Sequence, residues 1–257
     1  MPKKRHWFFD PWKYQVRTAT VSEYADGDVI KTHSHPWHQL VYASQGVMTV
    51  RTPEGAWVVP IHRGVWVPAG TRHSIQMSGP VSMRTLYLVP RLGRTLPDQP
   101  RVIGITPLLR ELILRMVELD SLNVRNPAHA HLIAVLLDHL QVMKSDAIHL
   151  PLPRDARAKR IAAALQEQPA DLRSLSELSK LAGASKRTIE RVFRRETGMG
   201  FGKWRQQLRL GHAMRLLAAG DAVTSVALDA GYDSVSAFIS AFRLTFGKTP
   251  GQCFRAA

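Results

Sequence analysis

The chain has 257 residues, of which 45% are hydrophobic and 21% charged, a composition typical of a folded protein of about two domains and unlike a membrane-embedded or disordered one. Its single cysteine excludes an internal disulfide, a zinc finger and an iron–sulfur site. The 35 Lys and Arg against 20 Asp and Glu give a net charge of +15, which favours a polyanionic partner, nucleic acid above all.

Residues 1–14 are basic and aromatic, and they lack the apolar run of a secretory signal. We interpret them as an N-terminal arm, whose Lys3, Lys4 and Arg5 either contact DNA or contact nothing. Because no later stretch of the sequence is long and apolar enough to span a membrane, we expect a cytoplasmic protein with no membrane partner.

Residues 15–90 are predicted to form a β-domain. Short runs rich in Val, Trp, Tyr and Thr alternate there with Gly- and Pro-containing turns, at the spacing of an all-β sandwich or barrel. All histidines of the chain except His212 lie at or before His149, so the first part of the chain carries the imidazole chemistry.

Two histidine motifs lie inside this β-domain. The first runs from Gly27 through His33-Ser-His35 and Gln39 to Gly46, and the second is Pro68-Ala-Gly70-Thr-Arg-His73. Together they resemble the two motifs of the cupin family. The resemblance implies a cupin-like β-barrel in which His33, His35, Gln39 and His73 converge; on one strand the first three would share a face and His38 would point away.

The residues of this site are compatible with two kinds of ligand, a metal ion or an organic molecule. Three neutral imidazoles and an amide can hold zinc, nickel or iron, but Gln39 replaces the usual cupin carboxylate, and the loss of this anionic ligand weakens a metal site. The sequence also departs from the motif at His62, where a glycine is expected. The alternative is a polar pocket that binds an organic effector without metal. Five aromatic residues are candidates either for the pocket lining or for the core: Trp37, Tyr42, Trp57, Trp66 and Tyr87.

Residues 91–145 have a helical pattern. Thr106-Pro107 and Pro127 each begin an amphipathic segment. These helices either pair two chains in a dimer or merely cover the β-domain, and spacing alone does not separate the two. Residues 146–155, which include Pro151 and Pro153, have the composition of a linker.

Residues 156–257 are predicted to be all-helical, with a first helix-turn-helix unit over about 174–196. Ser174 and Glu177 have capping-box spacing, Gly183 suits the turn, and Ser185 can cap the second helix. The outward face of that helix is polar and basic, as a phosphate-lined groove requires: Lys186, Arg187, Glu190, Arg191, Arg194 and Arg195.

The same pattern recurs about 48 residues later, over about 223–246, with Gly231 at the turn and Ser234 as the cap. A connecting helix over 201–218, about 25 Å long, is predicted between the two units. It would bring the two recognition helices to successive major grooves, which lie about 34 Å apart. If the recognition helices lie closer together than this, the DNA must bend.

The order of glycines, caps and aromatic residues across 156–254 resembles the AraC/XylS family of transcription regulators. The resemblance implies that Arg187, Glu190 and Arg191 make most of the base contacts. The second recognition helix departs from the family, because Ser240 stands where an arginine is common. Its small, nearly neutral face is expected mainly to position phosphates: Ser234, Val235, Ser236, Ala237 and Ser240.

We therefore predict an α+β protein of two domains: a cupin-like β-barrel followed by helices, and an all-α domain with two helix-turn-helix units. The predicted function is a transcription regulator that is not an enzyme, with double-stranded DNA, a small-molecule effector, a second copy of the chain and RNA polymerase as partners. A divalent metal is the one candidate cofactor. The alternatives are a metal-dependent cupin enzyme fused to a DNA-binding module and a nonspecific chromosome-coating protein.

Overall fold

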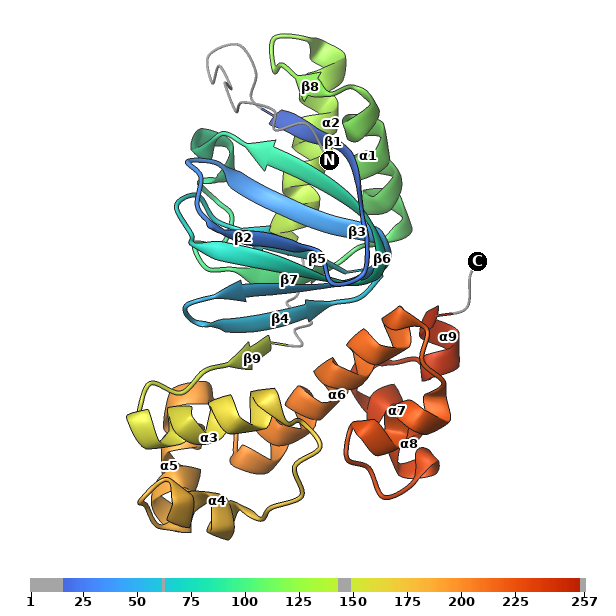
Figure 1. Ribbon diagram of the computed structural model, residues 1–257. Helices are drawn as coiled ribbons and strands as arrows, with labels where there is room; N and C mark the ends of the chain where they lie inside the picture. Colours follow the sequence, from blue (N-terminus) through green and yellow to red (C-terminus); the bar gives the residue numbers. More distant parts are fainter. Residues whose placement is uncertain (1–15, 62, 143–148, 255–257) are drawn as a thin grey trace.

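The computed structural model of the chain describes residues 16–61, 63–142 and 149–254. The predicted arm, His62 and residues 146–148 of the predicted linker lie outside the described residues. Figure 1 shows a β-rich N-terminal part with two helices at its side, and a C-terminal part made of helices alone. The predicted two-domain α+β fold is confirmed.

The N-terminal part is built on two long strands, β3 (His38–Thr52) and β6 (His73–Leu88), which pair antiparallel along most of their length. The remaining strands and one short 3-10 helix are β1 (Val16–Tyr24), β2 (Val29–His33), β4 (Gly55–Val59), β5 (Arg63–Val67), η1 (Pro90–Gly93), β7 (Arg101–Gly104), β8 (Ser121–Leu122) and β9 (His149–Pro151).

The long pair of strands, β3 and β6, takes part in two ladders of the sheet. The first half of β3 pairs with β5 and with the second half of β6, and this ladder continues to β7 on one side and to β1 and β8 on the other. The second half of β3 pairs with β4, and the first half of β6 pairs with β2. Register shifts on β3 between Ala43 and Val47 separate the halves, as expected where a strand bends between ladders.

Both faces of the first ladder are buried, which explains its long apolar runs. On β3, Val41 and Ala43 face the interior between the ladders, whereas Leu40 and Tyr42 face two helices, α1 (Pro107–Glu118) and α2 (Pro127–Val142). The helix starts predicted at Thr106-Pro107 and at Pro127 are confirmed, and the Thr106 side chain accepts a hydrogen bond from the backbone N–H of Leu109. These helices cover the sheet.

The sheet extends beyond residue 90, where the sequence pattern predicted only helices. β7 and β8 join the first ladder, and β9 lies within the predicted linker and pairs with β4. Strands of two to four residues are too short to show a period of two, so only their pairing partners, which are distant in sequence, define them.

The C-terminal part consists of α3 (Ala156–Glu167), α4 (Leu175–Leu181), α5 (Lys186–Thr197), α6 (Phe201–Ala219), α7 (Val223–Asp229), α8 (Val235–Phe246) and α9 (Pro250–Phe254). The connecting helix α6 contributes to both cores: Trp204 packs with Phe193, and Met214 packs with Phe238 and its neighbours. At 19 residues it is about 28 Å long.

Helix α6 also packs against the β-domain. Leu210, Ala213 and Met214 belong to the same buried cluster as Val47 and Val58 of the sheet. Beside this cluster, β9 extends the sheet towards α3, and the Trp204 indole N–H donates to the Pro151 carbonyl at 2.7 Å. The two parts of the chain therefore share a core as well as a covalent link (Figure 1).

None of the helices within the described ranges combines the length and the apolar character needed to cross a membrane.

Close approach of α6 depends on Gly79 of β6. This residue has φ of +67°, and a Cβ there would overlap the carbonyl group of Ala218. Gly27 has a similar φ of +79° but open space around it. We predict that Gly27→Ala costs about 1–2 kcal/mol of unfolding free energy through backbone strain alone, and that Gly79→Ala costs more because it also pushes α6 from the sheet. Urea unfolding and small-angle X-ray scattering measure both effects. If both variants lose the same unfolding free energy and neither changes the scattering curve, the contact between Gly79 and α6 is contradicted.

Candidate nucleic-acid interface and histidine cluster

Helices α4 and α5 form a tight helix-turn-helix unit held by local hydrogen bonds. The Ser174 hydroxyl accepts from the Glu177 backbone N–H at 3.3 Å, and the Glu177 carboxylate accepts from the Ser174 backbone N–H at 2.7 Å. Gly183 has φ of +67° in the turn, and the Ser185 hydroxyl accepts from the Thr188 N–H. The predicted capping box, turn and cap are confirmed.

Helix α5 has one buried and one charged face. Ile189, Val192 and Phe193 are buried in the core of the unit. The opposite face carries exposed Lys186, Arg187, Arg191, Arg194 and Arg195, together with half-exposed Glu190. The six side chains border one continuous, open stretch of surface. The predicted cationic surface is therefore continuous and faces solvent.

The cations of this face differ in how they are paired. Arg195 forms an ion pair with Glu196 at 2.7 Å. For Lys186, Arg187, Arg191 and Arg194, the described part of the chain provides no ion-pair partner. Four cations close together without ion-pair partners form a surface that attracts phosphate.

Glu196 anchors α5 to the start of α3. Its carboxylate accepts from the backbone N–H groups of Arg154 at 2.7 Å and Asp155 at 3.0 Å. These backbone bonds and the Arg195 guanidinium lower the pKa of the Glu196 carboxyl. The signal for this role is not local, because the partners lie about 40 residues apart in sequence.

The second unit, α7 and α8, repeats the geometry with a different surface. Gly231 has φ of +76°, the Ser234 hydroxyl accepts from the Ala237 N–H at 3.1 Å, and Phe238 and Phe242 are buried. Ser234, Ser236, Ala237 and Ser240 are exposed, and Val235 is half-buried. The face is small and neutral at its start, as predicted from the sequence.

Arg243 is a cation on α8 that the sequence analysis missed. It is exposed and lies three residues after Ser240 and seven after Ser236, which places the three on one helical face. Helical spacing could have identified it, because i, i+4 and i+7 positions align in any helix.

The histidines of the β-domain come from three segments. His33 is the last residue of β2, His35 lies in the turn before β3, and His73 is the first residue of β6, paired in register with His33. The prediction that His33, His35 and Gln39 share one strand is wrong, because β2 ends at His33 and β3 begins only at His38. Pairing of β2 with β6 brings the imidazoles together instead.

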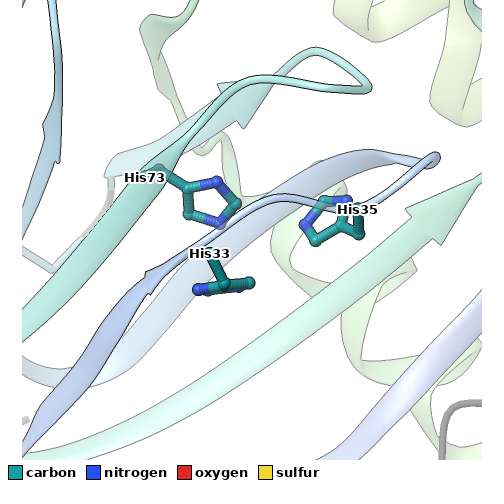
Figure 2. Close-up of side chains that lie close together, drawn as sticks. All are labelled: His33, His35 and His73. Atoms are coloured by element: carbon teal, nitrogen blue, oxygen red, sulfur yellow. The ribbon is translucent and has the colours of Figure 1, made fainter.

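The three imidazoles gather around one space, as Figure 2 shows. Ring centroids are 4.3 Å apart for His33 and His73, 5.1 Å for His35 and His73, and 5.8 Å for His33 and His35. One ring nitrogen of each lies within 4.8 Å of the others. This group of nitrogens is an arrangement that a metal ion or a hydrogen-bonding ligand can use.

Burial favours the neutral form of His35 and His73. It lowers the pKa of His73 to about 4 and lowers the pKa of His35, and neighbouring His33 adds to both effects. Gln39 is buried next to them: its Oε1 lies 3.1 Å from His35 Nε2, and its amide nitrogen donates to the Tyr87 hydroxyl at 3.1 Å. At neutral pH His35 and His73 therefore each present a ring-nitrogen lone pair.

The remaining candidates have other surroundings. His38 points away from the cluster, stacks on Trp66 and accepts from the Ala69 N–H at 3.1 Å. Tyr42, Trp57 and Trp66 are buried in the core. Two of the aromatic residues considered for the pocket contact the site: Tyr87, through Gln39 and a 5.3 Å edge contact with His35, and Trp37, whose backbone carbonyl lies 2.8 Å from His35 Nδ1.

Comparison with known proteins gives a family match for each of the two parts of the chain. Residues 17–140 match the AraC-like ligand binding domain family, and residues 178–256 match a helix-turn-helix domain family. The HTH-type transcriptional regulator NimR of Escherichia coli K12 is 33% identical over 246 residues, which cover 95% of this chain and 90% of NimR. The HTH-type transcriptional regulator RipA of Corynebacterium glutamicum is 38% identical over 100 residues, 39% of this chain and 30% of RipA.

Among solved structures, ToxT of Vibrio cholerae O395 aligns over 94% of this chain and 99% of its own, with 11% identity and a TM-score of 0.40.

Removing the Glu196 carboxylate should loosen α5 from α3. We predict that Glu196→Gln lowers the unfolding free energy by about 1–3 kcal/mol at pH 7, whereas Glu167→Gln, at an exposed position at the end of α3, has little effect. The folded-state pKa of Glu196 is lowered, so its contribution is present at pH 7 and is lost as the pH falls through the acid range. Urea unfolding at pH 7 and pH 4 should show that the difference in unfolding free energy between Glu196→Gln and Glu167→Gln is smaller at pH 4. If the two variants are equally stable at pH 7, Glu196 does not anchor α5 to α3.

Proposed function

Because the chain belongs to the AraC family of HTH-type transcriptional regulators, we propose that α5 reads its promoter in a major groove while the histidine cluster of the β-domain sets the response to an effector. The protein is a DNA-binding transcription regulator with a ligand-binding N-terminal domain. We further propose which residues contact DNA, how two chains pair and how the two domains are coupled.

The observation that carries the DNA contacts is the exposed cationic face of α5, on which Lys186, Arg187, Arg191 and Arg194 have no ion-pair partner among the described residues. Arg187 and Arg191 are four residues apart and lie on one face, so both guanidinium groups can enter the same groove. Each can bind a guanine edge with two hydrogen bonds, and Glu190 can accept from a cytosine amine. Lys186 and Arg194 bind the flanking phosphates, while Arg195 contributes less because Glu196 holds it.

Helix α8 mainly positions the protein on the duplex through contacts with phosphates. The hydroxyls of Ser236 and Ser240 and the guanidinium of Arg243 share its exposed face and suit phosphate oxygens. Ser234 is tied up as the helix cap, and Val235 and Ala237 offer methyl groups for thymine. The two units therefore have different roles, with base reading concentrated in the first.

The mechanism is linkage between the two parts of the chain. Strand β6 starts at His73 and reaches α6 at Gly79, and α6 belongs to the cores of both helix-turn-helix units. An effector that prefers one arrangement of the β-domain against α6 shifts the population that fits the promoter. No catalytic step is needed, and the full-length relative NimR is also a transcriptional regulator. An enzymatic role would instead require turnover of a substrate at the histidine cluster.

A second copy of the chain is the proposed partner of α1 and α2. Their inner faces cover the sheet, so pairing must use the outer faces, where Leu108 is 58% and Val142 78% exposed and Val135 is also exposed. We include RNA polymerase among the partners, since a regulator bound at a promoter lies next to it, and place the protein in the cytoplasm, where promoter DNA is found.

Replacing Arg191 should remove site preference. We predict that Arg191→Ala weakens binding to the promoter of the protein's own or neighbouring genes by about 1–3 kcal/mol, because a bidentate base contact is lost, while nonspecific binding changes much less. Fluorescence anisotropy with promoter and scrambled duplexes at matched salt measures the specificity ratio.

Two variants serve as controls for this experiment. Arg194→Ala should weaken binding to both duplexes equally and reduce the salt dependence, as expected for a phosphate contact. His35→Ala should keep promoter affinity and change only the response to effector. If Arg191→Ala retains the full specificity ratio, or if wild-type binding falls with salt equally on every sequence, the proposed reading of DNA fails.

Charge on the outer helix face should prevent pairing. We predict a wild-type dimer, and a monomer for the double variant Leu108→Glu, Val135→Glu, because two buried carboxylates would face their copies across the interface. Leu181→Glu, at an exposed position on α4, is the matched control and should leave the dimer intact. Sedimentation equilibrium distinguishes the states, and a monomeric wild type at micromolar concentration would exclude this interface.

A further inference from the structure

We propose that the contact between α6 and the outer face of the sheet contains a binding site for a small oxyanion of the phosphate type, held by Arg51 of the β-domain and Arg215 of α6. The site is separate from the histidine cluster and from the DNA-binding face of α5. An anion bound there fastens the C-terminal part of the chain to the β-domain, a role that neither of those two sites supplies.

The β-domain side of the site is the outer face of β3. Met48 and Val50 belong to the cluster that fills the interior between the two ladders. Thr49 and Arg51 alternate with them along the strand, and successive side chains of a strand point to opposite faces. These two side chains therefore point out of the β-domain, towards α6.

The helical side of the site is one face of α6. Gln207, Gly211 and Arg215 follow one another at intervals of four residues, which aligns them along the helix. A Cβ at Gly211 would lie 3.1 Å from Cγ2 of Val58, so the helix touches the sheet at the middle of this row. The polar side chains before and after the glycine are thereby brought close to β3.

A small cavity lies between these two faces. Its volume is about 40 Å³, which is more than one water molecule needs. Its polar lining consists of Thr49, Arg51, Gln166, Gln207 and Arg215, and none of the described residues that line it is acidic. The cavity is therefore cationic and suits a small anion.

The two guanidinium groups have no counterion within the described ranges. The Arg51 side chain makes neither an ion pair nor a hydrogen bond there, and Arg215 makes one hydrogen bond, from Nη2 to His212 Nδ1 at 3.3 Å. Burial lowers the pKa of Arg215, and the charge of Arg51 lowers it further. Because a guanidinium group stays protonated at neutral pH, two like charges face each other across the contact.

Thr49 provides a second, independent observation. The residue is 1% exposed, and its Oγ1 is buried without a hydrogen-bond partner in the described part of the chain. Gln207 Oε1, at the same cavity, is also buried and lacks a partner there. A buried polar group without a partner is costly. An oxyanion accepts from the Thr49 hydroxyl and from both guanidinium groups, and the Gln207 amide, turned over, donates to a further oxygen.

The donors indicate which anion the site prefers. A guanidinium group binds an oxyanion through two parallel N–H···O bonds, and two such groups with a hydroxyl offer more donors than the two oxygens of a carboxylate can use. A phosphate group has more oxygens and a higher charge, so it fits better. Arg51 is exposed, so a phosphate that carries an organic group can enter from that side.

The test uses the full-length chain in phosphate-free buffer. Sodium phosphate, glycerol phosphate and sodium acetate are each titrated against sodium chloride of equal ionic strength, by calorimetry and by thermal unfolding. We expect one phosphate bound per chain, a melting temperature that rises more with phosphate than with chloride, and weaker binding of acetate. Tighter binding of glycerol phosphate than of phosphate assigns the site to an esterified phosphate, and the reverse assigns it to the free ion.

Variants of the lining residues locate the bound ion. Arg51→Gln and Arg215→Gln should each weaken phosphate binding by at least about tenfold, and Thr49→Val by about threefold, because each removes a donor. Arg194→Gln is the matched control, since it removes one charge from the cationic face of α5, and it should bind phosphate as wild type does.

Stability without the anion separates binding from a merely structural role. In phosphate-free buffer Arg51→Gln should melt at or above the wild-type temperature, because it removes the like charge that faces Arg215. Arg51→Glu should melt higher still and no longer respond to phosphate, because its carboxylate takes the place of the anion. Both variants change an exposed residue, so the proposal stays testable even if Arg215→Gln or Thr49→Val does not fold. Circular dichroism checks the folding of each variant.

Either of two results would overturn the site. The first is a wild-type melting temperature that phosphate raises no more than chloride does, up to about 10 mM. The second is phosphate binding that Arg51→Gln retains, or that Arg194→Gln loses to the same extent. Promoter specificity is measured on the same phosphate-free samples. A chain that binds no phosphate and still prefers its promoter leaves the regulatory proposal intact, so the two proposals fail separately.

Discussion

The packing of α6 is the constraint on which the rest of the structure depends. This helix inserts Trp204 into the core of the first helix-turn-helix unit and Met214 into the core of the second, and it packs against Val47 and Val58 of the β-domain. One rigid helix of about 28 Å thus fixes the positions of both recognition helices relative to each other and to the β-domain. Neither unit can change its angle to the other without disturbing a shared core.

The same packing connects the histidine cluster with the DNA-binding face. From His73 to Gly79, β6 runs about 20 Å from the cluster to the contact with Ala218 of α6. At the other edge, β9 pairs with β4, and its Pro151 carbonyl accepts from Trp204. A ligand that shifts His33 and His73 acts on a strand that already touches α6, so modest movement at the cluster can change how α5 and α8 are presented.

Local signals made most of the helical part predictable. The capping box of Ser174 and Glu177, the caps Ser185 and Ser234, and the turn glycines each act within a few residues, so sequence spacing alone was sufficient to identify them. The convergence of His33, His35 and His73 was expected from motif spacing, although pairing of β2 with β6, and not a shared strand, produces it. Long-range contacts were not predictable. The short strands β7, β8 and β9, the anchoring of the start of α3 by Glu196, and the approach of Ala218 to Gly79 each depend on partners whose sequence positions carry no periodic signal.

Because α6 packs against both helix-turn-helix units and the sheet, the DNA-binding face and the ligand-binding domain are expected to affect each other through this helix. Hydrogen–deuterium exchange of the full chain with and without promoter DNA tests this most directly. Binding should slow exchange in α5 and also in the part of β6 around Gly79 and in the last turns of α6. Protection confined to the two helix-turn-helix units, with β6 unchanged, would contradict it.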